Sequence, residues 1–152
     1  MSQINPMAIA SYSHTQVGYL LRFALWACFA PLIIIAFIMW SSFSAIPFIV
    51  ATFFLLIGWV FGSLTVEVAT TELRWAFGPG FWKKSIARDQ IASAEATRTK
   101  FWYGFGIRAT PHGWLYNVQG LDAVLVTEIS GKTTLIGTDE PEALVRALNE
   151  NN

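Results

Sequence analysis

The stretch IPFIVATFFLLIGWVFGSLTVEVAT, residues 46–70, contains the point at which the pattern of the chain changes. Up to Leu64 the apolar residues run almost without interruption, whereas from Thr65 apolar and polar residues alternate. A continuous apolar run of about 20 residues is typical of a helix in lipid, and alternation is typical of a half-buried strand. The sequence therefore predicts a helical part that ends near Leu64 and a β-rich part that follows it.

A second apolar run, YLLRFALWACFAPLIIIAFIMW, occupies residues 19–40, and the serines of residues 41–45 separate the two runs. Between Arg22 and Glu67 there are 44 residues without Asp, Glu, Lys or Arg. A cleaved signal peptide is a poorer interpretation, because its apolar region would have only about 7–15 residues. We therefore expect a polar tail over residues 1–18 and a transmembrane helical hairpin over residues 19–64.

The distribution of positive charge predicts the orientation of this hairpin. The connecting residues 41–45 carry no cation, whereas Arg22 lies at the N-terminal end of the hairpin and Arg74, Lys83 and Lys84 follow it. Because Lys and Arg collect on the cytoplasmic side of membrane proteins, both termini should be cytoplasmic. The predicted location is the cytoplasmic (inner) membrane, crossed more than once.

The β-rich part, residues 65–152, reads as a series of short strands separated by turn residues. Gly78-Pro79-Gly80 fits a type II turn, with proline at the second position and glycine at the third. Pro111-His112-Gly113 and Ser130-Gly131-Lys132 predict two further tight turns. The expected strands cover residues 65–70, 72–77, 81–86, 91–97, 106–110, 113–118, 122–130 and 133–138.

The chain closes with TDEPEALVRALNE, which predicts an amphipathic helix. Asp139 and Glu142 have the spacing of a reciprocal cap, and Pro141 is tolerated in a first turn. One face of this helix should cover an open end of the sheets, because its apolar residues follow helical spacing. These residues are Leu144, Ala147 and Leu148.

No pattern for catalysis, a cofactor or a metal is found. Residues 104–109, GFGIRA, match the letters of a dinucleotide-binding loop, but the following Thr-Pro-His-Gly cannot continue as the helix that such a loop needs. His14 and His112 are the only histidines and Cys28 is the only cysteine, so no ligand cluster at metal-binding spacing exists. We assign no catalytic residue, no cofactor and no metal.

Basic residues gather in the first half of the β-rich part, and acidic residues in the second. Anionic lipid attracts nearby Lys and Arg by about 1 kcal/mol each. An alternative is that these cations only set the topology. Nucleic acid is a poor partner, because the net charge is zero and the acidic half would repel phosphate. The candidate contacts to a membrane surface or ligand are Trp82, Lys83, Lys84, Arg88, Arg98 and Lys100.

The segments WYGFGIRATPHGWLYNVQGLDAV and IGTDEPEALVRAL, after a hydrophobic hairpin, resemble bacterial membrane proteins with a pleckstrin-homology-like domain. This resemblance covers roughly residues 65–148. It implies two orthogonal antiparallel sheets with about seven strands, a PH-like barrel closed by a C-terminal helix. It implies no reaction and transfers no site.

These observations together predict a non-catalytic integral membrane protein that presents a PH-like binding or scaffold domain at the cytoplasmic face. Its expected partners are the lipid bilayer and either a protein or anionic lipid headgroups. One alternative is a factor for membrane homo-oligomer assembly through the small residues Ala51, Gly58, Gly62 and Ser63. Another is an enzyme on a lipid-like substrate with an unrecognised site.

Overall fold

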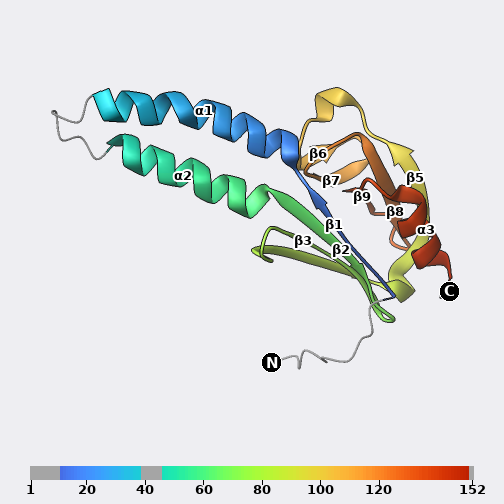
Figure 1. The fold of residues 1–152 in the computed structure, drawn as a ribbon. Coiled ribbons are helices and arrows are strands. Elements are labelled where there is room, and N and C mark those ends of the chain that lie inside the picture. Colours follow the sequence, from blue (N-terminus) through green and yellow to red (C-terminus); the bar gives the residue numbers. More distant parts are fainter. Residues whose placement is uncertain (1–10, 39–45, 151–152) are drawn as a thin grey trace.

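A computed structural model of the protein describes residues 11–38 and 46–150. These residues form two β-sheets, a pair of long helices and a short C-terminal helix (Figure 1). The first sheet, sheet A, is antiparallel and has the order β1-β2-β3-β4. Its strands are β1 (Tyr12–Val17), β2 (Ser63–Val68), β3 (Glu72–Phe77) and β4 (Trp82–Ala87).

The second sheet, sheet B, has the order β5-β8-β9-β7-β6. All its neighbouring strands are antiparallel except β7 and β9, which run parallel. The 3-10 turns η2 (Arg88–Gln90) and η3 (Phe101–Tyr103) lie before and after β5 in the chain. The strands are β5 (Ile91–Arg98), β6 (Gly106–Thr110), β7 (Gly113–Asn117), β8 (Asp122–Glu128) and β9 (Thr133–Gly137).

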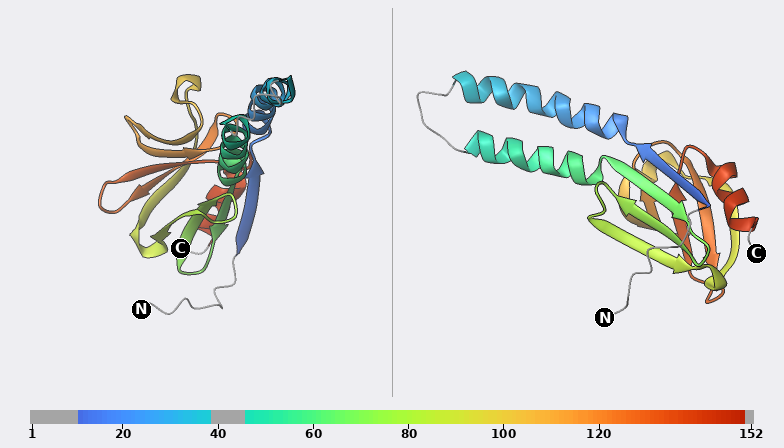
Figure 2. Two further views of the ribbon diagram at one scale, coloured as in Figure 1. Left: turned by 90° about the vertical axis from the view of Figure 1, so that its left-hand side faces the viewer. Right: turned by 60° about the horizontal axis from the view of Figure 1, so that its bottom comes forward.

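Two long helices, α1 (Tyr19–Ile38) and α2 (Ile46–Phe61), lie in the chain between β1 and β2. They lie side by side and extend away from the sheets, on the side opposite the C-terminal helix (Figures 1 and 2). A single residue, Gly18 or Gly62, separates each helix from its strand. The Gly18 amide donates a hydrogen bond to the Gly62 carbonyl at 2.9 Å. The helix pair is therefore a direct continuation of two neighbouring strands.

The main core lies between the inner faces of the two sheets, and the C-terminal helix α3 (Pro141–Asn149) closes one side of it. Alternation along β2 and β3 buries every second residue, as the sequence predicts. The predicted C-terminal helix is confirmed, and its predicted apolar face is buried. The residues of that face are Leu144, Ala147 and Leu148.

The expectation of a transmembrane hairpin in a multi-pass membrane protein is wrong. None of the helices in residues 11–38 and 46–150 has the length and apolar character needed to cross a membrane. α2 has 16 residues, which rise about 24 Å, and α1 has 16 residues after Arg22. Both lengths are short of the bilayer's hydrocarbon thickness of about 30 Å. Met39, Trp40 and the connecting residues 41–45 lie outside the described residues.

The expected order of a helical hairpin followed by a barrel of about seven antiparallel strands is also wrong. Strand β1 precedes the helices, so the helix pair is inserted within sheet A rather than placed before it. The described residues contain nine strands, and β9 inserts between β7 and β8 to make a parallel pair. Alternation shows that a segment is a strand, but it does not identify its neighbours.

The predicted polar tail contains a strand that the sequence analysis missed. Residues 12–17 pair with β2 along their whole length, whereas residues 1–10 lie outside the described part. The inward-facing residues of β1 are Tyr12, His14 and Gln16. Because two of these three residues are polar, the strand carries no apolar alternation for the sequence to display.

Two local predictions need correction. The Gly80 amide donates to the Phe77 carbonyl at 3.1 Å, so Gly78, with φ of +53°, occupies the second turn position and Pro79 the third. The prediction therefore missed a hydrogen-bonded turn that begins one residue earlier, at Phe77. Gly80, with φ of +92°, has the positive φ expected of the third position in the predicted turn. The Gly78 amide also donates to the Ser63 carbonyl at 2.9 Å, so contact with β2 helps to place this turn.

The expected cap of α3 is the second correction. The residue before the helix is Glu140, and no side chain caps the helix there. Instead, the Thr138 hydroxyl accepts a hydrogen bond from the Glu140 amide at 3.1 Å, and Asp139 binds His14. A long-range contact with His14 has replaced the local cap that the Asp139 and Glu142 spacing suggested.

Candidate functional site

The six residues predicted to contact a membrane surface or ligand do not form one site. Trp82, Lys83 and Lys84 are successive residues of β4, and alternation sends them to opposite faces. Trp82 lies opposite Phe77, and Lys84 lies opposite Trp75, so both face the inner side of sheet A. Lys83 lies opposite Ala76 and faces the outer side.

The other three predicted residues lie elsewhere. Arg88 is buried, with 8% of its surface exposed, and its guanidinium donates to the carbonyls of Ala147 and Leu148 at the end of α3. It therefore holds the helix and is not available to a membrane or ligand. Arg98 is exposed, and its Nε lies 3.7 Å from Asp122 Oδ1. The Lys100 ammonium lies 5.4 Å from the centre of the Trp102 ring.

A pocket of about 520 Å³ opens between the inner faces of the two sheets. Its walls come from β3, β4 and η2 on one side and from β6, β7, β8 and β9 on the other, whereas no residue of α3 contributes. Its lining residues include Trp75, Trp82, Lys84, Trp114, Glu128 and Lys132. We name this site the inter-sheet pocket.

The inter-sheet pocket combines apolar walls with a few polar groups. The Trp75 indole nitrogen is buried and has no hydrogen-bond partner among the described residues. Glu128 accepts a hydrogen bond from Ser130, and its Oε1 lies 3.5 Å from the Lys132 ammonium. Burial raises the pKa of the Tyr116 phenol, so this residue stays neutral at the pocket wall. The arrangement is suited to binding.

Trp82 and Lys84 were predicted from the sequence as contact residues, but the other members of the pocket were not. One signal was present in the alternation of β4, where Trp82, Lys84 and Ile86 share a face. A lysine between two apolar residues on the same strand face interrupts an otherwise apolar face and indicates a polar function there. The contributions of Trp114 and Lys132 could not be read from the sequence, because they depend on how sheet B faces sheet A.

The helix pair α1–α2 is a second candidate site, because it exposes many large apolar side chains. Three successive residues, Ile33, Ile34 and Ile35, are 51%, 59% and 49% exposed. The other exposed large apolar residues of the pair are Tyr19, Leu20, Phe23, Phe37, Ile38, Ile46, Phe48, Ile49, Phe53, Leu55, Leu56 and Trp59.

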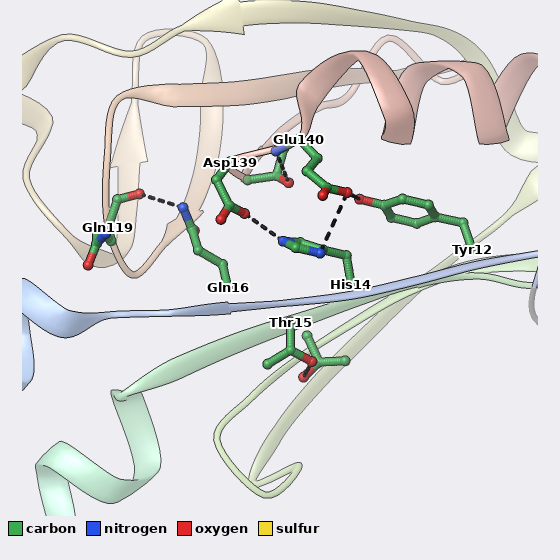
Figure 3. A network of polar contacts seen from close by, with 9 residues as sticks. Tyr12, His14, Thr15, Gln16, Gln119, Asp139 and Glu140 are labelled. Atoms are coloured by element: carbon green, nitrogen blue, oxygen red, sulfur yellow. Dashed lines mark hydrogen bonds and ion pairs between the residues drawn. The ribbon is translucent and has the colours of Figure 1, made fainter.

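A polar network joins β1 to the residues before α3 (Figure 3). His14 Nε2 lies 2.6 Å from Asp139 Oδ1, and His14 Nδ1 lies 3.6 Å from Glu140 Oε2. The Tyr12 hydroxyl donates to Glu140 at 3.5 Å, and the Gln16 amide donates to the Gln119 carbonyl at 3.0 Å. These contacts hold the edge strand of sheet A to the opposite side of the fold.

Stability at high pH should depend on Tyr12. Burial, and then the charge of Glu140, raise the pKa of its phenol to about 12. Because the neutral phenol is favoured in the fold, this contribution is complete below pH 10 and is lost as the pH rises towards 12. We expect Tyr12→Phe to flatten the fall in the free energy of unfolding between pH 10 and 12, measured by urea denaturation. Parallel pH profiles of the two proteins would contradict this role.

The comparisons with known proteins give no further information about these sites. No family model matches the chain, and neither curated proteins nor solved structures contain one that is significantly similar to it. The resemblance to bacterial PH-like membrane proteins therefore stays a prediction. Within the described residues, no group of three or more His, Cys, Asp or Glu side chains is placed to hold a metal ion.

Proposed function

We propose that this protein is a non-catalytic binding protein whose helix pair associates with lipid and holds the two-sheet domain beside it. The observation that carries the proposal is the exposed apolar surface of α1 and α2. The proposal requires the pair to enter the apolar part of a lipid layer, and it does not require either helix to cross that layer.

The distribution of the exposed residues favours lipid as the occupant. Successive residues of a helix lie about 100° apart around its axis, so Ile33, Ile34 and Ile35 together span more than half of the circumference. A protein partner normally docks on one stripe, with contacts at every third or fourth residue. Acyl chains, in contrast, surround a helix and cover apolar side chains on every exposed side.

The connection between helices and sheets supports the second part of the proposal. Gly18 and Gly62 are the only residues between the helices and their strands, and their backbones are hydrogen-bonded to each other. A link this short leaves the sheets little freedom to turn relative to the helices. The inter-sheet pocket would then stay at a set orientation beside the lipid.

The proposal includes no reaction because the inter-sheet pocket is poor in reactive groups. Of the described residues that line it, Glu128 alone carries a carboxylate, and Lys132 and Ser130 already contact that group. General acid and base catalysis usually needs a titrating group free to contact the substrate. The enzyme alternative would rest on this one carboxylate, whose Oε1 has no hydrogen-bond partner among the described residues but lies 3.5 Å from the Lys132 ammonium.

The homo-oligomer alternative is also weakened by the packing of α2. A Cβ atom at Gly62 would lie 2.9 Å from the Arg22 side chain, so this small residue already accommodates α1 of the same chain. Ser63 is the first residue of β2 and not part of the helix. Two of the four small residues proposed for contact between copies are therefore used within the chain.

Flotation with neutral phosphatidylcholine vesicles tests the lipid association. We expect the protein to float with the vesicles at 0.1 M and at 1 M salt, because apolar contacts are not screened. The double variant Ile34→Asp, Phe53→Asp places one carboxylate on each helix, at a cost of roughly 3 kcal/mol each in lipid. Its partition coefficient should fall by more than about 100-fold.

The matched control is Phe101→Asp, Trp102→Asp, which changes two residues of η3 that are 78% and 75% exposed. This variant should float like the original protein. Equal flotation of both double variants would contradict a role for the helix pair. Flotation that disappears at 1 M salt would instead favour contact between lysines and lipid headgroups. A stable dimer that does not float with the vesicles would indicate that a second copy of the chain covers the apolar helices.

A further inference from the structure

We propose that the inter-sheet pocket binds a small organic carboxylate with a flat apolar body, such as an aromatic acid. The proposal goes beyond lipid association, since it concerns the gap between the sheets and no residue of α1 or α2 lines the pocket. It rests on three features: an unpaired buried donor, an adjacent unpaired cation and a set of apolar walls.

The donor is the indole N–H of Trp75. Only 3% of Trp75 is exposed, and its nitrogen has no hydrogen-bond partner among the described residues. Its ring meets Tyr116 edge to face, with centres 5.3 Å apart, so packing fixes its orientation. A buried donor without an acceptor costs about 1–3 kcal/mol, and such groups are rare in native proteins. The group points to an acceptor oxygen supplied by a ligand.

The cation is Lys84, which lies directly across the β3–β4 ladder from Trp75 on the inner face of sheet A. Within the described part of the chain, no acidic side chain lies within ion-pair distance of its ammonium group. The second lysine of the pocket, Lys132, lies 3.5 Å from Glu128 and is partly neutralised. The residue with the free positive charge is therefore the cross-strand neighbour of the residue with the free donor.

The walls define the rest of the ligand. Trp82 and Trp114 come from opposite sheets, and each is 48% exposed at the pocket. Ile86 and Ile107 supply further apolar surface. A volume of about 520 Å³ falls within the range of small-molecule sites, about 300–1,000 Å³. Two half-exposed indole rings favour a flat apolar body on which they can stack.

The charges select an anion over a cation. Indole rings also attract cations, but a cation in this pocket would lie near the unpaired Lys84. The buried Glu128 Oε1 has no hydrogen-bond partner, but Lys132 lies 3.5 Å from it and offsets its charge, so the two lysines and one carboxylate leave the pocket with one net positive charge. A neutral ligand could satisfy Trp75 and would leave Lys84 without a partner. A carboxylate has two oxygens, one for the indole N–H and one for the ammonium, and charge-assisted hydrogen bonds of this kind are the stronger ones.

Titration of the full chain with 2-naphthoate, followed by NMR of ¹⁵N-labelled indole groups in mild detergent, tests the proposal. We expect a saturable downfield shift of the Trp75 N–H proton, because it gains an acceptor. 2-Naphthamide and 2-naphthylmethylamine should bind at least about fivefold more weakly, because they lack the negative charge. An unmoved Trp75 signal at saturation, or equal binding of all three compounds, would overturn the proposal.

A pair of neighbouring lysines provides the matched variants. Lys84→Gln should weaken 2-naphthoate binding about tenfold. Lys83→Gln changes the preceding residue, which lies on the outer face of sheet A, and should leave the affinity for 2-naphthoate unchanged. Both positions are exposed, so both variants should fold, and partition of the probe into detergent is the same for each. Equal affinities of the two variants would overturn the role of Lys84. These outcomes are independent of vesicle flotation, so either proposal can fail alone.

Discussion

Replacing Gly113 by alanine should lower the free energy of unfolding by about 4 kcal/mol. Gly113 has a φ of +100°, which costs an L-residue about 1–3 kcal/mol, and overpacking adds about 1–3 kcal/mol more. A Cβ atom there would lie 2.0 Å from the carbonyl oxygen of Thr133. Because Thr133 begins β9 and Gly113 begins β7, relief of this clash would separate the two parallel strands.

Gly106→Ala is the matched control for this prediction. Gly106 has nearly the same φ, +95°, but a Cβ atom there would meet nothing within 4 Å. The control should therefore lose only the conformational part, about 1–3 kcal/mol, without the cost of overpacking. Urea denaturation of the full chain, followed by tryptophan fluorescence, measures both variants. Equal losses for the two glycines would show that contact with Thr133 is unimportant.

The second large effect is expected for Phe77→Ala, which should lower the free energy of unfolding by about 3–5 kcal/mol. Phe77 is fully buried, and its ring centre lies 5.7 Å from that of Phe61 and 6.4 Å from that of Tyr116. These neighbours belong to the end of α2 and to sheet B, so one side chain joins three parts of the fold. Its removal leaves a cavity that rigid strands cannot close.

Phe81→Ala is the control for this second prediction, because Phe81 lies only four residues further along the chain and is 73% exposed. Its loss should change the free energy of unfolding by less than about 0.5 kcal/mol. Denaturation curves measured under the same conditions give both values. If Phe77→Ala proved as mild as Phe81→Ala, the core would not depend on the junction of α2 with the sheets.

Local patterns were sufficient to locate most of the strands after Leu64. The segment 91–97 is an ambiguous case, because its alanines favour helix and its place between strands favours strand; the structure shows that it belongs to strand β5. The turn at Pro111-His112-Gly113 was also correctly located, between β6 and β7. Signals of this kind depend on a few neighbouring residues, and they survive in the fold because each strand has one buried and one exposed side.

The candidate sites were predicted less well, because their residues come together only through long-range packing. Arg88 was read as a surface cation, but it binds the end of α3, about 60 residues away. Lys84 was correctly selected, but its partner Trp75 and the opposing Trp114 were not. The identity of a charged residue does not show whether its side chain faces water, a helix end or a pocket.

The sequence by itself determined that an uncharged helical segment is followed by alternating strands and an amphipathic C-terminal helix. These features follow from short-range periodicity, which is present within each segment of the chain and does not depend on the other segments. The tertiary structure alone decided that β1 precedes the helices, that β9 lies parallel to β7, and that Trp75 and Lys84 face a pocket between two sheets. Strand order and inter-sheet contacts depend on the packing of distant segments, whose energies no local pattern records.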